Sequence, residues 1–256
     1  MNNLKLVLMT WLGALSLCSC NNESIVSLSE HSVIYCAEGS PETFNPQLVT
    51  SGTTIDATSN QLYDRLIAYK GKENKLIPAL AKSWHVTRDG KKVTFYLRKD
   101  VAFHQTDYFT PSRFLTADDV MFSFNRILES QHPFHFVSGG SYPFFQNIGL
   151  RELIEDVEKI NEYTVRFHLS HADSSFLANL ATDFAIILSA EYAEQLSKQK
   201  IKANIDTHPI GTGPFKLKEY RVGSLIRFYR HEQYWREPAQ IEQLVFDITP
   251  SNTGRL

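Results

Sequence analysis

The sequence predicts a mixed α/β fold, because short strands and helices follow one another without the regular spacing of βαβ units. Two observations carry this prediction. Several segments alternate apolar and polar residues with a period of two, as half-buried strands do. Others place apolar residues three or four positions apart, or begin with residues that cap helices. No internal repeat or low-complexity tract is evident in the 256 residues.

The clearest strand pattern is at residues 93–97, where Val93, Phe95 and Leu97 alternate with residues suited to the opposite face. The turn pair Asp89-Gly90 precedes this segment, as in a hairpin. The same alternation predicts further strands at residues 32–37, 165–169, 215–220, 225–231 and 244–248.

The best-marked helix is expected to begin after Thr116 and to end near Leu128. Thr116 is a good N-cap residue, and Asp119 stands at the third helical position, as in a capping box. Residues 55–69 are also predicted to be helical, from apolar side chains at helical spacing. Those side chains are Leu62, Leu66 and Tyr69. Shorter helices are expected at 174–181 and 190–200, and a long aromatic loop at 131–149.

The first 20 residues are expected to be an export signal and not part of the fold. Lys5 supplies a positive start, and residues 6–17 form an apolar run too short to span a membrane in the mature protein. Leu17-Cys18-Ser19-Cys20 resembles the bacterial lipobox, so we expect cleavage before Cys20 and a lipid on its thiol. Cleavage without lipidation is the alternative. Residues 21–31 would then tether the fold outside the cytoplasm.

The charge balance argues against a nucleic-acid partner. The formal net charge is -2, so the chain has no basic field to attract phosphates. Hydrophobic residues make up 43% and charged residues 21%, which is ordinary for a folded soluble protein.

The histidines do not form a convincing metal site. Two pairs stand three residues apart: His132 with His135, and His168 with His171. The second pair straddles a strand end, where residues three apart lie on opposite faces. Neither pair has an obvious third ligand, and no CxxC motif suggests zinc. We therefore predict no metal and no cofactor.

No catalytic centre is predicted either. The acidic pairs Asp118-Asp119 and Glu155-Asp156 consist of neighbours in sequence, which do not face each other on a helix. The first pair is better placed to favour the positive end of a helix. The glycine-rich residues 211–214 lack the lysine of a phosphate-binding loop and suggest a turn between strands. A periplasmic hydrolase would need a nucleophile and base that these motifs do not supply, so we expect no enzymatic activity.

Seven sequence blocks occur in order along the chain: 34–47 (IYCAEGSPETFNPQ), 51–54 (SGTT), 63–66 (YDRL), 78–84 (PALAKSW), 95–104 (FYLRKDVAFH), 114–120 (FLTADDV) and 209–215 (PIGTGPF). Together they resemble family 5 of the bacterial extracellular solute-binding proteins, the dipeptide- and oligopeptide-binding group. Residues 109–113, 220–223, 230–231 and 253–256 resemble a branch that transports antimicrobial peptides. A haem-binding branch shares much of the same pattern.

The resemblance implies a particular architecture. Family members have two lobes of the type II, cluster C kind that close on a ligand, and this chain resembles the first, mixed-sheet lobe only. Residues 32–74 and 201–256 would form one subdomain of that lobe, and residues 75–200 the other. The second lobe would be absent, so we expect a truncated product or an incomplete gene.

The resemblance also implies a function. The chain would be the periplasmic substrate-binding component of an ABC transporter, a monomer that captures peptides for a permease and ATPase in the inner membrane. Antimicrobial peptides would be one ligand class. A haem-binding lipoprotein of the same family and a non-functional fragment are the alternatives.

The ligand-binding residues that the resemblance implies lie in two segments. Thr50, Ser51, Gly52, Thr53 and Thr54 would supply hydroxyls and close backbone approach at the cleft edge. Tyr142 and Phe144, in the aromatic loop, would wall the site. Solvated turn residues and ordinary core packing, respectively, are the alternatives.

Cys36 is expected to lack a partner in this chain. In relatives, the resemblance implies, the matching cysteine is disulfide-bonded to one just downstream of the position of Leu256. Cys18 and Cys20 would be lost or lipidated, so Cys36 would remain a free thiol.

Overall fold

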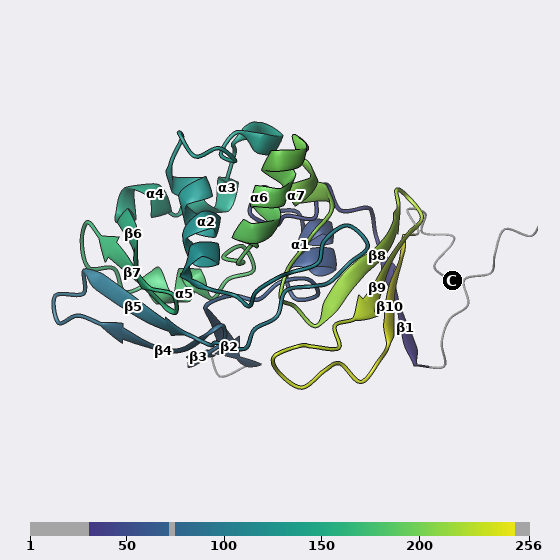
Figure 1. Ribbon diagram of the computed structural model, residues 1–256, viewed down its shortest axis with the longest axis horizontal. Coiled ribbons are helices and arrows are strands. Elements are labelled where there is room, and N and C mark those ends of the chain that lie inside the picture. Colours follow the sequence, from purple (N-terminus) through teal and green to yellow (C-terminus); the bar gives the residue numbers. More distant parts are fainter. Residues whose placement is uncertain (1–30, 72–74, 249–256) are drawn as a thin grey trace, which may run out of the picture.

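Three β-sheets organise the protein in the computed structural model, which describes residues 31–71 and 75–248 (Figure 1). The outer sheet has the order β1 (Ser32–Ala37), β10 (Gln243–Ile248), β9 (Leu225–Arg230) and β8 (Phe215–Arg221). The middle sheet has the order β4 (Ala81–Val86), β5 (Lys92–Leu97), β7 (Thr164–Leu169) and β6 (Ile154–Asn161). A small hairpin consists of β2 (Ile67–Lys70) and β3 (Lys75–Pro78).

The outer sheet joins segments that are far apart in the chain. β1 pairs with β10 in parallel, and the other neighbours are antiparallel. The middle sheet is antiparallel throughout and contains only residues between 81 and 169. The predicted strands at residues 32–37, 93–97, 165–169, 215–220, 225–231 and 244–248 are confirmed to within one or two residues at their ends.

Short helices cover the middle sheet and fill the space between the two large sheets (Figure 1). The longest, α2 (Ala117–Leu128), packs against β6, β7 and α6 (Ala190–Gln199). Asp119 Oδ2 accepts a hydrogen bond from Thr116 N at 2.8 Å, as the capping pattern predicts. The others are α1 (Gly52–Thr58), α3 (Pro143–Asn147), α4 (Leu150–Leu153), α5 (Phe176–Leu180), α7 (Asn204–Thr207) and a 3₁₀ turn, η2 (Val137–Gly139).

The predicted helix at residues 55–69 is wrong beyond Thr58, where α1 ends. The following backbone bonds to distant segments: Gln61 O accepts from Phe215 N, and Leu62 O accepts from Gly213 N at 3.0 Å. This close approach is possible because Gly213 has no side chain; a Cβ there would lie 2.5 Å from the carbonyl carbon of Leu62. Tertiary contacts therefore overrode the helical spacing. Residues 211–214 connect α7 to β8, so they do not form a turn between two strands.

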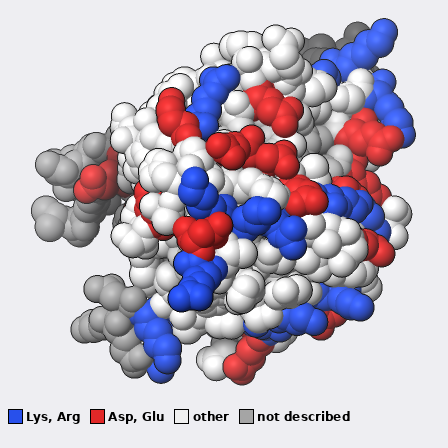
Figure 2. Space-filling model, turned by 90° about the vertical axis from the view of Figure 1, so that its left-hand side faces the viewer, with Lys and Arg blue, Asp and Glu red and all other residues white. Residues whose placement is uncertain are grey.

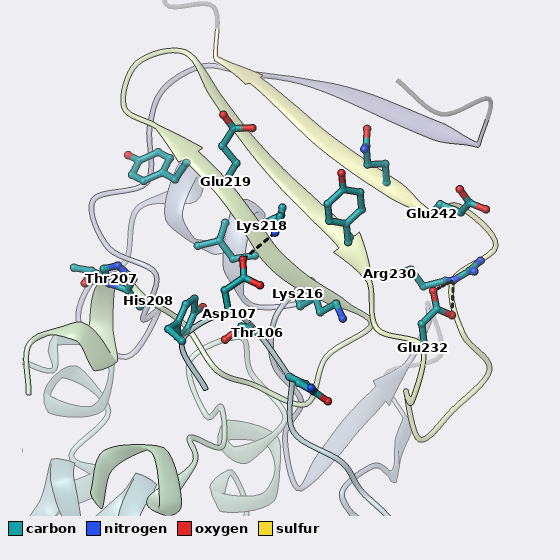
Figure 3. Close-up of a pocket in the computed structure, with 16 residues that line it drawn as sticks. Thr106, Asp107, Thr207, His208, Lys216, Lys218, Glu219, Arg230, Glu232 and Glu242 are labelled. Atoms are coloured by element: carbon teal, nitrogen blue, oxygen red, sulfur yellow. Dashed lines mark hydrogen bonds and ion pairs between the residues drawn. The ribbon is translucent and has the colours of Figure 1, made fainter. Parts of the chain in front are cut away.

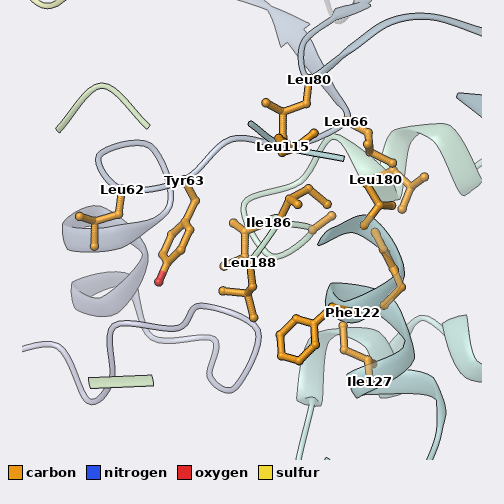
Figure 4. Packing of buried hydrophobic residues seen from close by; sticks show 14 of the residues in the cluster. Leu62, Tyr63, Leu66, Leu80, Leu115, Phe122, Ile127, Leu180, Ile186 and Leu188 are labelled. Carbon is orange, nitrogen blue, oxygen red and sulfur yellow. The ribbon is translucent and has the colours of Figure 1, made fainter. Parts of the chain in front are cut away.

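The core is continuous from the outer sheet to the middle sheet. Figure 4 shows Ile186 and Leu188 between Tyr63 on one side and Phe122 of α2 on the other. In the middle sheet, Phe167 meets Phe95 and Phe124 edge to face, with ring centroids 5.7 and 4.9 Å apart. This packing fixes the positions of the loops that lie above it.

The surface carries both signs of charge. On the face in Figure 2, basic and acidic side chains are interspersed and no single-sign patch dominates. Within residues 31–71 and 75–248, no helix is long and apolar enough to cross a membrane. No group of three possible metal ligands occurs in the same residues. The predicted leader and the lipid site Cys20 lie outside the described residues.

Candidate functional site

A buried ion pair lies at the centre of the candidate site. Arg126, from α2, donates through Nη1 and Nη2 to Asp206 Oδ1 and Oδ2, at 2.9 and 2.6 Å. Both side chains are almost completely buried. Burial works to lower the pKa of Arg126, but the Asp206 carboxylate outweighs it and the pKa is raised. The bidentate geometry holds α2 and α7 in a fixed relation.

The Asp206 carboxylate also fixes two loops. It accepts from Asn45 Nδ2 at 2.7 Å and from Ser138 Oγ at 2.9 Å. We call Arg126, Asp206, Asn45 and Ser138 the Asp206 hub. It brings together the loop before α1 and the turn after α2, which are more than 90 residues apart in sequence, since 138 − 45 is 93.

The loop from the hub leads directly to the predicted ligand residues. Gln47 N donates to Asn45 Oδ1, and Gln47 Nε2 donates to Ile186 O. Ser51 then caps α1, so residues 50–53 stand at its amino end. Thr50 and Gly52 are exposed, and Ser51 and Thr53 are half-buried. These four residues therefore keep some accessible surface at the amino end of α1.

Two of the predicted ligand residues are buried instead. Thr54 Oγ1 accepts from Glu42 N and Ser51 Oγ, so it braces the loop. Tyr142 is only 1% exposed; its hydroxyl accepts from Arg126 Nε and donates to His135 O. The expectation that Tyr142 walls the site is not supported, because its ring packs in the core. Burial raises the pKa of its hydroxyl.

Phe144, in α3, is the remaining predicted ligand residue. Its half-buried ring stacks on Phe184, with centroids 4.2 Å apart and planes 18° apart. Phe184 is two residues before Ile186, whose carbonyl accepts from Gln47. The structure therefore places Phe144 in an aromatic stack with Phe184, separate from the contacts of Thr50–Thr53.

Sequence reasoning missed Arg126, Asp206 and Ser138. One sequence feature could have indicated Arg126: it is a basic residue between Phe124 and Ile127, on the apolar side of the predicted helix. A buried guanidinium needs a partner, so this position calls for a distant carboxylate. Nothing in the sequence indicates which acidic residue supplies it.

A second buried polar cluster anchors the outer sheet. Asp64 accepts from Thr212 Oγ1, Tyr234 OH and Trp235 Nε1, at 3.0, 3.1 and 2.8 Å. Burial raises the pKa of Asp64, although these three donors oppose the shift. Arg98 and Arg236 lie against the Trp235 ring, at 4.7 and 4.5 Å from its centroid.

Two histidines meet at the neighbouring glycine. Gly213 O lies 3.0 Å from His104 Nε2 and 3.1 Å from His231 Nδ1, and both nitrogens donate to it. Gly211 N donates to His104 Nδ1, which fixes His104 as the neutral tautomer protonated on Nε2. Burial lowers the pKa of both imidazoles. We call Asp64, His104, His231 and Gly213 the Gly213 cluster; it is enclosed and serves the fold.

A cavity lies elsewhere, along β8 (Figure 3). Its volume is about 980 Å³, and it is lined by residues 105–108, residues 207–208 and three strands of the outer sheet. Two ion pairs lie in its lining: Lys218 Nζ lies 2.9 Å from Asp107, and Arg230 Nε lies 3.2 Å from Glu232 (Figure 3). No predicted ligand residue lines this cavity.

Cys36 is exposed on β1 and forms no disulfide within the described residues. β1 is an edge strand of the outer sheet, and Val33, Ile34 and Tyr35 are also exposed there. The other cysteines of the chain, Cys18 and Cys20, lie outside the described residues, so the free thiol of Cys36 stays a prediction.

Comparison with known proteins identifies the relatives. Residues 75–256 match the family described as "Bacterial extracellular solute-binding proteins, family 5 Middle". The chain is 50% identical over 229 residues to the dipeptide-binding protein of Escherichia coli K12, covering 90% of this chain and 43% of that protein. It is 44% identical to the peptide transport periplasmic protein SapA of Salmonella typhimurium, covering 87% and 41%.

A solved structure agrees. The dipeptide-binding protein of Pseudoalteromonas sp. SM9913, in complex with Met-Leu, superposes with a TM-score of 0.86 and 49% identity. The match covers 88% of this chain and 44% of that one. The chain thus spans less than half the length of the relatives it matches.

Proposed function

The chain belongs to family 5 of the bacterial extracellular solute-binding proteins, and from this premise we propose that it serves peptide capture for an ABC transporter. It would supply one side of a peptide-binding cleft in the periplasm and deliver ligand to a permease and ATPase. The single observation that carries the proposal is the similarity to dipeptide-binding proteins across nearly all of the described residues.

The Asp206 hub supports the location of the cleft side. Residues Thr50–Thr53 offer hydroxyls and main-chain groups at the surface, which are the contacts that extended peptides use. Within the described residues, the hydroxyls of Thr50 and Thr53 make no hydrogen bond. The stacked rings of Phe144 and Phe184 are a second candidate contact surface, for apolar parts of a ligand.

Further parts of the proposal concern the whole protein. We propose that residues 32–74 and 201–256 act as one subdomain and residues 75–200 as the other, in keeping with the origin of the two large sheets. A lipid on Cys20 would hold a monomer at the membrane. Antimicrobial peptides are the narrower ligand class that we propose from the sequence resemblance, and the similarity to SapA supports peptide transport in general.

Titration calorimetry of the purified chain with dipeptides, free amino acids and haem tests the proposal. We expect weak but saturable binding of dipeptides and none of free amino acids. Weak binding follows because a ligand held from one side stays hydrated, and exposed charge pairs contribute only about 0–1 kcal/mol. Thr53→Val should weaken binding about fivefold, the value of one hydrogen bond near 1 kcal/mol. Saturable binding of haem without binding of dipeptides would contradict the proposal.

A further inference from the structure

Phe136 is an exposed aromatic residue whose ring is nevertheless held in place. The side chain is 68% exposed. Its ring packs edge to face on His135, with centroids 4.6 Å apart. Gly140 also lies close to the ring, and a Cβ there would come within 2.6 Å of Phe136 Cδ1. Gly140 therefore leaves the space in which the ring rests.

The backbone of this turn is strained. Ser138, Gly139 and Gly140 have φ values of 62°, 101° and 72°. A left-handed conformation is easy for glycine but unfavourable for serine. Ser138 keeps it because its hydroxyl donates to Asp206 Oδ2. Arg126 Nε also donates to Phe134 O, so the hub forms hydrogen bonds with the turn both before and after Phe136.

The Asp206 hub links the turn to the loop that leads to the proposed cleft side. The Asp206 carboxylate that binds Ser138 also binds Asn45, in the loop that leads to Thr50–Thr53. Backbone strain fixed by surrounding structure occurs preferentially at ligand-binding and switch segments. Fixing a solvated ring in one position does not stabilise the fold. It does favour binding, because a ring that is already fixed loses little conformational freedom when a ligand contacts it.

We propose that Phe136 is a specificity residue, an aromatic surface that receives an apolar or aromatic side chain of the bound peptide. This inference rests on the proposed function and adds the ligand class. Peptides with such a side chain should bind better than peptides with a small polar one. The expected preference is about two- to tenfold, the range of one aromatic pair.

The experiment compares Ala-Phe with Ala-Ser by NMR titration at millimolar peptide. The proteins are the unaltered chain, Phe136→Ser and, as a matched control, Val222→Ser. Val222 is 79% exposed in the turn between β8 and β9, away from the hub. Phe136→Ser should remove the preference for Ala-Phe and leave the Ala-Ser affinity unchanged. Val222→Ser should change neither, and Phe136→Trp should retain the preference.

The outcomes separate the inference from the proposed function. If both dipeptides bind and Phe136→Ser keeps the preference, the inference is wrong and the function stands. An equal loss for both dipeptides would also overturn it, because Phe136 would then act on the fold and not on selectivity. Absence of binding by every variant would overturn the proposed function, and this inference with it.

Discussion

The Asp206 hub and the Gly213 cluster both bury a carboxylate, but they stabilise it differently. Asp206 faces the guanidinium of Arg126 in a bidentate pair. Among the described residues, the hydrogen bonds to Asp64 come only from neutral donors, and Arg98 and Arg236 approach through the Trp235 ring. A buried ion pair is sensitive to loss of either charge, whereas neutral donors and close backbone packing are sensitive to shape and pH.

The two kinds of carboxylate stabilisation, by an ion pair and by neutral donors, occur in regions that hold different parts of the molecule. The hub holds two surface loops, one of them strained, beside the proposed ligand contacts. The Gly213 cluster holds β8 and the segment after β9 against residues 61–64, with no exposed group to offer a ligand. We conclude that the charge pair fixes the two surface loops and the neutral cluster maintains the joint between the sheets.

The largest expected effect comes from Arg126→Met. The variant leaves Asp206 buried without its cation, which typically costs about 3–5 kcal/mol of unfolding free energy. Chemical denaturation measures this loss. Lys159→Met is the matched control, because Lys159 and Asp118 form an exposed pair whose loss should cost at most about 1 kcal/mol. Equal losses in the two variants would mean that the hub pair contributes no more than a surface pair.

Gly213→Ala should have the next largest effect. The added Cβ would lie 2.5–2.6 Å from backbone atoms of Gln61, Leu62 and Tyr63, none of which is a flexible side-chain end. Such overpacking costs about 1–3 kcal/mol or more. Gly52→Ala is the control, since a Cβ there meets nothing within 4 Å. A Gly213→Ala protein as stable as the control would show that residues 61–63 can move away freely.

Acid should weaken the Gly213 cluster. Burial lowers the folded-state pKa of His104 and His231, so the unfolded chain binds their protons more readily. This stability is fully present above the unfolded pKa of about 6.5 and is lost as the pH falls below it, by up to about 1.4 kcal/mol per pH unit for each histidine. The raised pKa of Asp64 opposes the loss at lower pH. His132, with a pKa lowered to about 4, acts in the same direction as His104.

Denaturation midpoints between pH 7.5 and 5 check this expectation. His231→Asn should flatten the profile, and the exposed His171→Asn should not. Lys216 and Glu232 are the other charges that act on His231, and both stay in place in these variants. A profile of the unaltered chain that is level over this range would contradict the assignment of neutral histidines.

The sequence predicts the parts of the fold that depend on local pattern. Alternation located β5 and β7, and the Thr116–Asp119 pattern located the start of α2. The helix at 55–69 failed because residues 61, 62 and 64 bond to Phe215, Gly213 and Ile187, which are more than 100 residues away. β6 was missed because its exposed acidic and basic residues obscure the alternation.

The sequence indicated which segments carry the candidate ligand residues, but not the contacts that hold those segments in place. Arg126 and Asp206, which join the loop before α1 to the turn after α2, are 80 residues apart in sequence. Tyr142 could not be assigned from its residue type, because an aromatic side chain in a loop serves the core or a ligand equally well. The distant hydrogen bonds decide between the two, and they are a property of the fold.

Chemical-shift mapping tests the central claim most directly, that the surface above the Asp206 hub is one side of a peptide-binding cleft. The backbone amide resonances of the ¹⁵N-labelled chain are followed while Ala-Phe is added to millimolar concentration. We expect saturable shifts concentrated at residues 50–53, 136–140 and 144, with little change along β8. Shifts concentrated at residues 105–108 and 216–220, which line the large cavity, would contradict it.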